Sequence, residues 1–112
     1  MKINIPKVLV PVDLGEYAAE LAGNFLQVWV NPPLHVMQQH TEATQAAQAE
    51  TGSQAPLYEW YAQQWSQHSD PAQHWTAQEL EALQTNDPAL LAWLIDATWQ
   101  AIGAHRFKKK KG

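Results

Sequence analysis

The chain has 112 residues, of which 46% are hydrophobic and 16% charged, so it can form one modest core and is too apolar for a disordered protein. Its formal net charge of −4 means that no basic field covers the body of the molecule, which argues against nucleic-acid binding. The lack of cysteine excludes disulfides, thiolate zinc sites and cysteine nucleophiles.

The first thirty residues have the alternating pattern of β-strands. Residues 2–14 alternate apolar and other side chains, with Pro6 and Pro11 indicating an edge strand or a break. Residues 25–31 form the clearest strand, with Leu26, Val28 and Val30 on one face. We expect an antiparallel hairpin with a long connection at residues 15–24, which holds one helical turn at 17–21. Two strands alone are marginal in water, so the hairpin must pack on helices or pair with a neighbour's strand.

Two helices are expected in the middle of the chain. Pro32 and Pro33 end the strand and open a helix over residues 34–50, which we expect to be packed at its beginning and solvated or frayed beyond Thr41. A second helix is predicted over residues 56–67 because apolar and aromatic residues recur there at helical spacing. Its stripe consists of Leu57, Trp60, Tyr61, Gln64 and Trp65.

The last third of the chain predicts a pair of helices with defined ends. Thr76 and Glu79 have the spacing of a capping box, in which the hydroxyl accepts the Glu79 amide and the carboxylate reaches back to the Thr76 amide. Asn86 or Asp87 is placed to cap the second helix, with Pro88 in its first turn. Gly103 is a stop signal for this helix, with an extension through residues 104–106 as the alternative. The apolar positions of this helix recur at helical spacing: Leu90, Leu91, Leu94, Ile95, Thr98, Ala101 and Ile102.

These elements predict an α+β fold with an N-terminal antiparallel β-hairpin packed on a mainly helical body of about four helices. We expect one domain over residues 1–107 and a basic, disordered tail over residues 108–112. No signal peptide or membrane span is recognisable, because Pro6 and Pro11 interrupt the apolar stretch near the start. The expected location is the cytoplasm, which is the host cytoplasm if a phage encodes the chain.

Six tryptophans are many for a chain of this size, and each can fill the core or contact a partner. The candidate partner-binding residues are Trp29, Trp60, Trp65, Trp93 and Trp99. Core filling is the favoured interpretation for Trp60 and Trp65, as it is for Leu94. Trp29 and Trp99 are the better candidates for exposure.

The sequence contains no recognisable catalytic, cofactor or metal site. His68, Asp70 and His74 lie in one connector and could meet at a metal, but solvated turn residues are the favoured interpretation. The carboxylates show no paired cleft, and Glu79 already has its role at the helix cap. A helix beginning at Pro88 would present Ala and Leu instead of base-reading side chains, so it is built for burial. We expect neither an enzyme nor a nucleic-acid or membrane partner.

Lys108–Lys111 is the only concentrated positive charge in the chain. It is interpreted first as a solvated tail, with a weak phosphate or partner contact as an alternative. A lysine run also implies an A-rich coding stretch, which could be a slippery ribosomal frameshift site. Reading the nucleotides and the overlapping frame tests that hypothesis.

The segment W-T-A-Q-E-L-E-A-L followed by D-P-A-L-L-A-W-L resembles a motif of the small tail assembly chaperones of long-tailed bacteriophages. That family has the form T-x-E-E-L-x-x-L followed by P-x-x-L-x-x-L, which Thr76, Glu79, Leu80, Leu83, Pro88, Leu91 and Leu94 match. This chain departs from the family in its tryptophan content and in the Gln- and Ala-rich stretch 38–49.

The resemblance implies a non-enzymatic protein that binds the tape-measure protein, recruits tail-tube subunits and self-associates, with a longer product made by frameshifting. The alternatives are a small structural or connector protein of the virion, such as a head–tail joining protein, and a helical regulator that binds a protein partner.

Overall fold

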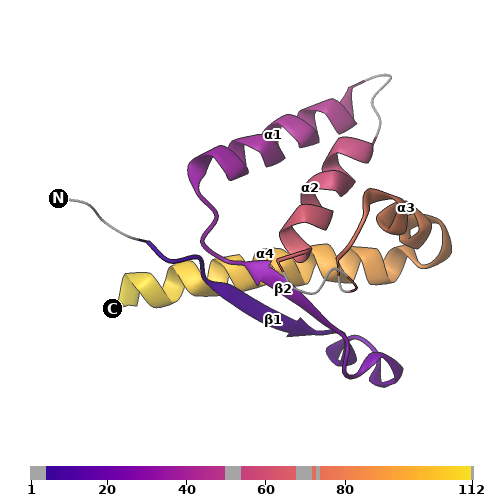
Figure 1. Ribbon diagram of the computed structural model, residues 1–112, viewed down its shortest axis with the longest axis horizontal. Helices are drawn as coiled ribbons and strands as arrows, with labels where there is room; N and C mark the ends of the chain where they lie inside the picture. The colour runs from indigo at the N-terminus through magenta and orange to yellow at the C-terminus, as the bar shows by residue number, and fades with distance from the viewer. Residues whose placement is uncertain (1–4, 50–53, 68–71, 73, 112) are drawn as a thin grey trace.

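The computed structural model describes residues 5–49, 54–67, 72 and 74–111, with the backbone alone for residues 107–111. The fold is α+β, as predicted: a two-stranded ribbon lies beside a helical body (Figure 1). The ribbon consists of β1 (Leu9–Asp13) and β2 (Phe25–Trp29). The helices are α1 (Leu34–Gln48), α2 (Ala55–Trp65), α3 (Ala77–Asn86) and α4 (Pro88–Lys111).

The ribbon buries one face, which explains its alternating sequence. Leu26, Val28 and Val30 are fully buried, and they face the same side as the half-buried Val8, Val10 and Val12. Val30 N donates to Val8 O at 3.0 Å and Leu14 N to Asn24 O at 2.8 Å, so the even-numbered residues of β1 form the hydrogen-bonded pairs. Pro11 lies opposite Gln27 at a position that needs no ladder donor. The predicted edge-strand role of Pro11 is thus confirmed.

The connection between the strands contains two short 3₁₀ turns, η1 (Leu14–Glu16) and η2 (Ala19–Leu21), where the sequence predicted one helical turn. Two glycines shape it. Gly23 has φ of +92°, a conformation that other residues rarely adopt. At Gly15 a Cβ atom would lie 2.9 Å from the backbone of Ala22, so the close approach of the two turns requires glycine.

The prediction for α1 is right in its start and largely right in its packing. Leu34 in the first turn is 72% exposed, but Val36 and Met37 pack against the core as expected for the beginning of the helix. Beyond Thr41 the helix continues to Gln48 with most of its side chains exposed, so it is solvated there without fraying. Ala43 is the one buried residue of the helix.

The helix ends are capped largely as expected. Glu79 N donates to Thr76 Oγ1 at 3.2 Å, and Leu90 N donates to Asp87 Oδ1 at 3.2 Å. The Glu79 carboxylate differs from the predicted capping box, because it accepts the Thr76 hydroxyl at 3.2 Å instead of the backbone amide. These bonds satisfy amides that a helix N-terminus would otherwise leave unpaired.

The predicted stop at Gly103 is wrong, because α4 runs through it to Lys111. Ile102 beside it is 2% exposed, so burial of the adjacent turn outweighs the roughly 1 kcal/mol that a helical glycine costs. The extended α4 includes Lys108–Lys111, for which the sequence suggested a disordered tail.

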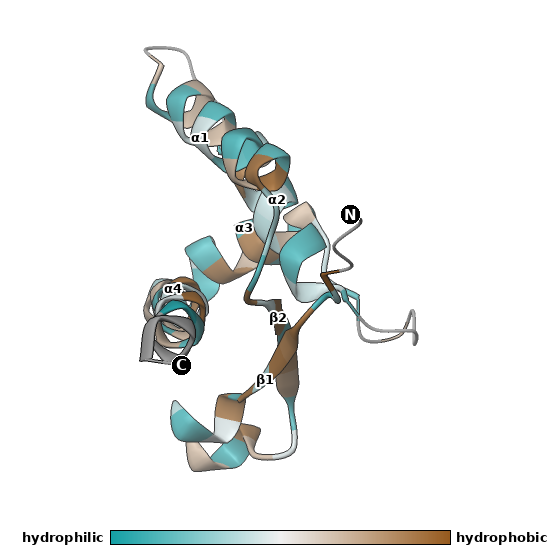
Figure 2. Ribbon diagram, turned by 90° about the vertical axis from the view of Figure 1, so that its left-hand side faces the viewer, coloured by the Kyte–Doolittle hydropathy of each residue, from teal (hydrophilic) through white to brown (hydrophobic). Residues whose placement is uncertain are grey.

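The core lies between the inner face of the ribbon, α2 and the middle of α4. Figure 2, in which α4 is seen nearly end-on, shows the hydrophobic ribbon beside that helix. No helix within the described ranges combines the length and hydrophobicity needed to cross a bilayer. The largest fully buried side chains are Trp65, Leu26, Leu80, Leu94 and Ile102.

Candidate functional site

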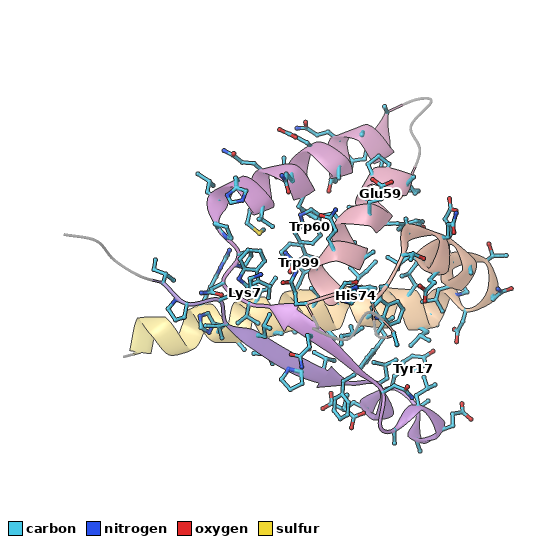
Figure 3. All side chains as sticks on the ribbon, viewed as in Figure 1. Lys7, Tyr17, Glu59, Trp60, His74 and Trp99 are labelled. Atoms are coloured by element: carbon cyan, nitrogen blue, oxygen red, sulfur yellow. The ribbon has the colours of Figure 1, made fainter. Side chains whose placement is uncertain are left out.

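Four of the six tryptophans gather in one ring cluster, which we define as His40, Trp60, Tyr61, Trp65, Trp75 and Trp99. Trp60 and Trp65 are buried at 5% and 0% exposure, in line with the interpretation favoured for them. Trp99 is half-buried and lies between α2 and α4, as Figure 3 shows. Its ring stacks on that of Trp60 with centroids 5.8 Å apart and an interplanar angle of 7°.

The polar atoms of the ring cluster are hydrogen-bonded to one another and to α1. Trp99 Nε1 donates to Tyr61 Oη at 2.8 Å, and Trp60 Nε1 donates to the backbone carbonyl of Val36 at 2.9 Å. The His40 ring lies 4.6 Å from that of Trp60 and 4.9 Å from that of Trp99. These contacts bind α1, α2 and α4 together, so the half-buried Trp99 serves the fold.

The same environment changes the acid–base behaviour of two members. Burial among the indole rings lowers the pKa of His40 below its ordinary value of 6.5, because desolvation disfavours the charged ring. Burial raises the pKa of Tyr61 above 10.0, and the hydrogen bond from Trp99 partly offsets that rise. Both groups are therefore held neutral near pH 7, as suits a packed cluster.

A buried polar pair joins α2 to α4. Trp65 Nε1 donates to Thr98 Oγ1 at 2.8 Å, and that hydroxyl donates to Leu94 O at 2.8 Å. Both residues are 0% exposed. Thr98 occupies a core position that the periodicity identified, but its role as acceptor for a distant indole left no signal in the sequence.

The remaining candidate tryptophans lie near the ribbon. Trp93 is half-buried and packs on Tyr17, with ring centroids 5.6 Å apart, so it ties the strand connection to α4. Trp29 is half-buried on the ribbon's outer side, where Lys7 Nζ lies 4.3 Å from its ring centroid. The Lys7 ammonium also donates to Gln67 Oε1 at 2.9 Å.

The outer face of the ribbon carries exposed apolar residues beside Asp13 and Gln27. We call it the outer ribbon face; its apolar strand residues are Leu9, Pro11, Phe25 and Trp29, which lie opposite the buried valines, and Ile5 precedes β1. Ile5 is 75%, Phe25 46% and Leu9 37% exposed. Together with Leu34 at 72%, these are the large hydrophobic residues that the described part of the chain leaves in solvent.

A small crevice of about 70 Å³ lies between this face and the α1–α2 pair. Trp29 and Gln64 both line it, and Trp29 Nε1 and Gln64 Oε1 are buried without a hydrogen-bond partner among the described residues. One atom is a donor and the other an acceptor. A crevice of this volume holds one or two waters, which could satisfy both.

Two larger grooves lie at opposite ends of the ribbon. A groove of about 590 Å³ is lined by residues 5–7, 29–33, His105 and Arg106. A groove of about 460 Å³ is lined at the other end by residues around the strand connection and by His74, Trp75 and Glu79.

The possible metal ligands that the sequence offered do not come together among the described residues. Of the possible metal ligands in the connector, His68 and Asp70 lie outside the described residues, and His74 lines the smaller groove, as does Glu79. Within the described ranges no three His, Asp or Glu side chains gather as metal ligands would. The described residues present exposed apolar side chains on the outer ribbon face and charged side chains around the two larger grooves.

Comparison of the chain with protein-family models, with curated proteins and with solved structures gives no match.

Proposed function

We propose that this chain is a non-enzymatic chaperone of phage tail assembly, which binds the tape-measure protein and recruits tail-tube subunits to it. The observation that carries the proposal is the outer ribbon face. Two apolar side chains on one side of the ribbon, Leu9 and Phe25, are exposed to solvent.

The chemistry of that face suits a helical client. Two exposed apolar residues on the two strands can contact the apolar stripe of an amphipathic helix, as helix-in-groove partners do. The hydrogen-bonded ring cluster behind the ribbon supports the outer ribbon face. It contributes no residue to that face. Exposed apolar patches of this kind mark interaction sites in soluble proteins.

A binding experiment with the tape-measure protein of the same genome tests the proposal. The variant L9S/F25S should bind at least about tenfold more weakly, since hot-spot residues contribute about 1–2 kcal/mol or more each. The matched control A92S/A104S alters two exposed positions on the solvent side of α4 and should bind as the wild type does. Unchanged binding by a folded L9S/F25S variant would refute the assignment of this face.

Two observations test the chaperone role itself: the position of the gene in the genome, and whether the protein is present in the finished virion. A chaperone gene should lie between the tail-tube gene and a very long tape-measure gene. Mass spectrometry of purified virions should not detect the protein, whereas a head–tail joining protein would remain in the particle. Detection at stoichiometric levels would reject the chaperone role in favour of that competitor.

The lysine codons give an independent test. If they form a frameshift site, antibodies to the N-terminal ribbon should detect a second, longer product, and synonymous changes at codons 108–111 should abolish it. A single product from the natural codons would show that the lysines serve the protein alone.

A further inference from the structure

We propose that the crevice between Trp29 and Gln64 binds a primary carboxamide group, which a Gln or Asn side chain of the bound client supplies. The carboxamide site does not depend on the identity of the client, whereas the source of the carboxamide rests on the proposed function. Two observations carry the inference. The crevice contains two buried polar atoms without a partner among the described residues, and it lies beside the outer ribbon face.

Gln64 is a polar residue at a position where the pattern of α2 calls for an apolar one. It belongs to the stripe that also contains Trp60 and Trp65, and it is 2% exposed. Its Oε1 atom is buried and accepts no hydrogen bond from the described residues. An unpaired buried oxygen lowers the stability of a fold, and an apolar side chain of similar size would avoid that loss. The glutamine therefore points to a hydrogen-bond partner from outside the chain.

The indole of Trp29 is unpaired in the same way. Three indoles of the ring cluster donate their Nε1 hydrogens within the fold, at distances of 2.8 or 2.9 Å: Trp60, Trp65 and Trp99. Nε1 of Trp29 is buried and has no acceptor among the described residues. The Lys7 ammonium lies 4.3 Å from the centroid of this ring and donates to Gln67 Oε1 at 2.9 Å, which keeps the ring in place. The Trp29 donor is thus positioned before a ligand arrives.

The two unpaired atoms define the ligand, because Trp29 Nε1 needs an acceptor and Gln64 Oε1 needs a donor. A primary carboxamide carries an acceptor and a donor on one edge of a planar group. A trans peptide group of a main chain points its N–H and its C=O in opposite directions. A carboxylate would place a second acceptor against Gln64 Oε1, and an ammonium would place a second donor against the Trp29 N–H. The complementary ligand is therefore a neutral carboxamide.

The size of the crevice also fits a carboxamide. Its volume of about 70 Å³ corresponds to about two waters, whose share of the liquid is roughly 30 Å³ each. The carbon, oxygen and nitrogen atoms of a carboxamide fill this space, whereas a single hydroxyl group leaves part of it empty. A carboxamide can take the place of the waters and reproduce their hydrogen bonds, so their displacement loses no polar contact.

The position of the crevice indicates where the carboxamide comes from. Trp29 belongs both to the crevice and to the outer ribbon face, and Leu9 is its partner on the neighbouring strand. A client segment that contacts Leu9 therefore lies beside the crevice. Two exposed residues, Gln39 and Gln63, also line the crevice, so a side chain can enter it from solvent.

A titration with propionamide, which has the carboxamide of a Gln side chain, tests the site without the client. Each of the six tryptophans gives one indole signal in a nitrogen–proton correlation spectrum, and Trp29→Phe identifies the Trp29 signal by removing it. The Trp29 signal should shift to saturation, with a Kd in the roughly millimolar range expected for so small a ligand. The Trp65 signal should not move, because its donor is bonded to Thr98.

Three further ligands of similar size separate the carboxamide from other groups. Propionate and butanone can accept from Trp29 but cannot donate to Gln64, and propanol has one oxygen for both bonds. Each should bind at least about fivefold more weakly than propionamide, because a buried polar atom stays unpaired or is poorly paired. Shifts that do not saturate, or that are equal for all four ligands, would overturn the proposal, since the crevice would then hold solvent only.

The variant Gln64→Met removes the acceptor while keeping the length of the side chain. It should weaken propionamide binding at least about fivefold without lowering the Tm, because the lost oxygen was unpaired. The matched control Gln78→Met alters an exposed glutamine of α3 and should bind propionamide as the wild type does. A lowered Tm with unchanged propionamide binding would overturn the proposal, since Gln64 would then serve the fold alone.

Binding of the tape-measure protein of the same genome tests the source of the carboxamide. Gln64→Met should weaken this binding at least about fivefold, because Gln64 is buried and can reach the client only through the crevice. Unchanged client binding by a Gln64→Met variant that no longer binds propionamide would refute the client as the source. The variant L9S/F25S should lose the client and still bind propionamide. Normal client binding by L9S/F25S would thus refute the proposed function, whereas a wild type that does not bind propionamide would refute the carboxamide site.

Discussion

Replacing Thr98 by valine tests how much the buried contact between α2 and α4 stabilises the fold. The hydroxyl accepts the indole N–H of Trp65 at 2.8 Å, and both residues are fully buried. Valine would leave that donor unpaired, which costs about 1–3 kcal/mol. Burying a methyl group in place of the hydroxyl returns about 0.8 kcal/mol. The free energy of unfolding should therefore fall by about 0.2–2 kcal/mol.

Urea and thermal unfolding followed by circular dichroism measure the effect, since 1 kcal/mol shifts the Tm of a domain of this size by about 4–8 °C. The matched control is Thr44→Val in α1. Its hydroxyl also donates to a carbonyl four residues back, His40 O at 2.9 Å, but it receives no indole. The control should change stability by no more than about 0.5 kcal/mol.

A double-mutant cycle with Trp65→Phe isolates the hydrogen bond from the packing change. In the phenylalanine background no indole donor remains to be left unpaired, so Thr98→Val should cost at least about 1 kcal/mol less than in the wild type. Equal costs in the two backgrounds would refute the reasoning, because the loss would then not arise from the indole donor.

Three further predictions follow from single residues. Because burial lowers the pKa of His40, the unfolded chain takes up a proton at higher pH than the folded chain, so stability should be greatest above pH 6.5 and fall as the pH drops toward the folded-state pKa. The free energy of unfolding, measured in urea across that pH range, should change with pH, and His40→Gln should reduce that change. An unchanged pH dependence in the variant would contradict the assignment to His40. Gly103→Ala should raise the Tm by a few degrees, worth about 0.5–1 kcal/mol, since an added Cβ meets nothing within 4 Å. A lowered Tm would mean that α4 needs glycine at position 103. Gly23→Ala is the contrasting variant, and its Tm should fall because Gly23 has a φ of +92°. Asp87→Ala removes the acceptor for Leu90 N and should cost about 0.5–2 kcal/mol in thermal unfolding, and a neutral result would show that the cap contributes nothing.

The ribbon could be predicted from the sequence because one buried face imposes a strict alternation. Leu26, Val28 and Val30 had to share a side, and the structure buries all three. The helix starts at Thr76 and Asp87 were also predictable, since capping depends on residues close in sequence.

Predictions failed where distant packing decided the outcome. The apolar residues at the start of α1 suggested packing there, and Val36 and Met37 do pack on the core, but Leu34 is left in solvent. Gly103 is a stop signal only when nothing beyond it is stabilised, but α4 continues past it and places His105 and Arg106 against the end of the ribbon. The crevice between Trp29 and Gln64 depends on three elements meeting, for which no local pattern exists.

The stacked pair of Trp60 and Trp99 gives the molecule an internal spectroscopic probe. Two parallel indoles 5.8 Å apart, one from α2 and one from α4, couple their electronic transitions, and that coupling weakens steeply as the rings separate. The near-ultraviolet circular dichroism of the unlabelled protein should therefore report whether these two helices stay docked, in the free state and while a client is bound.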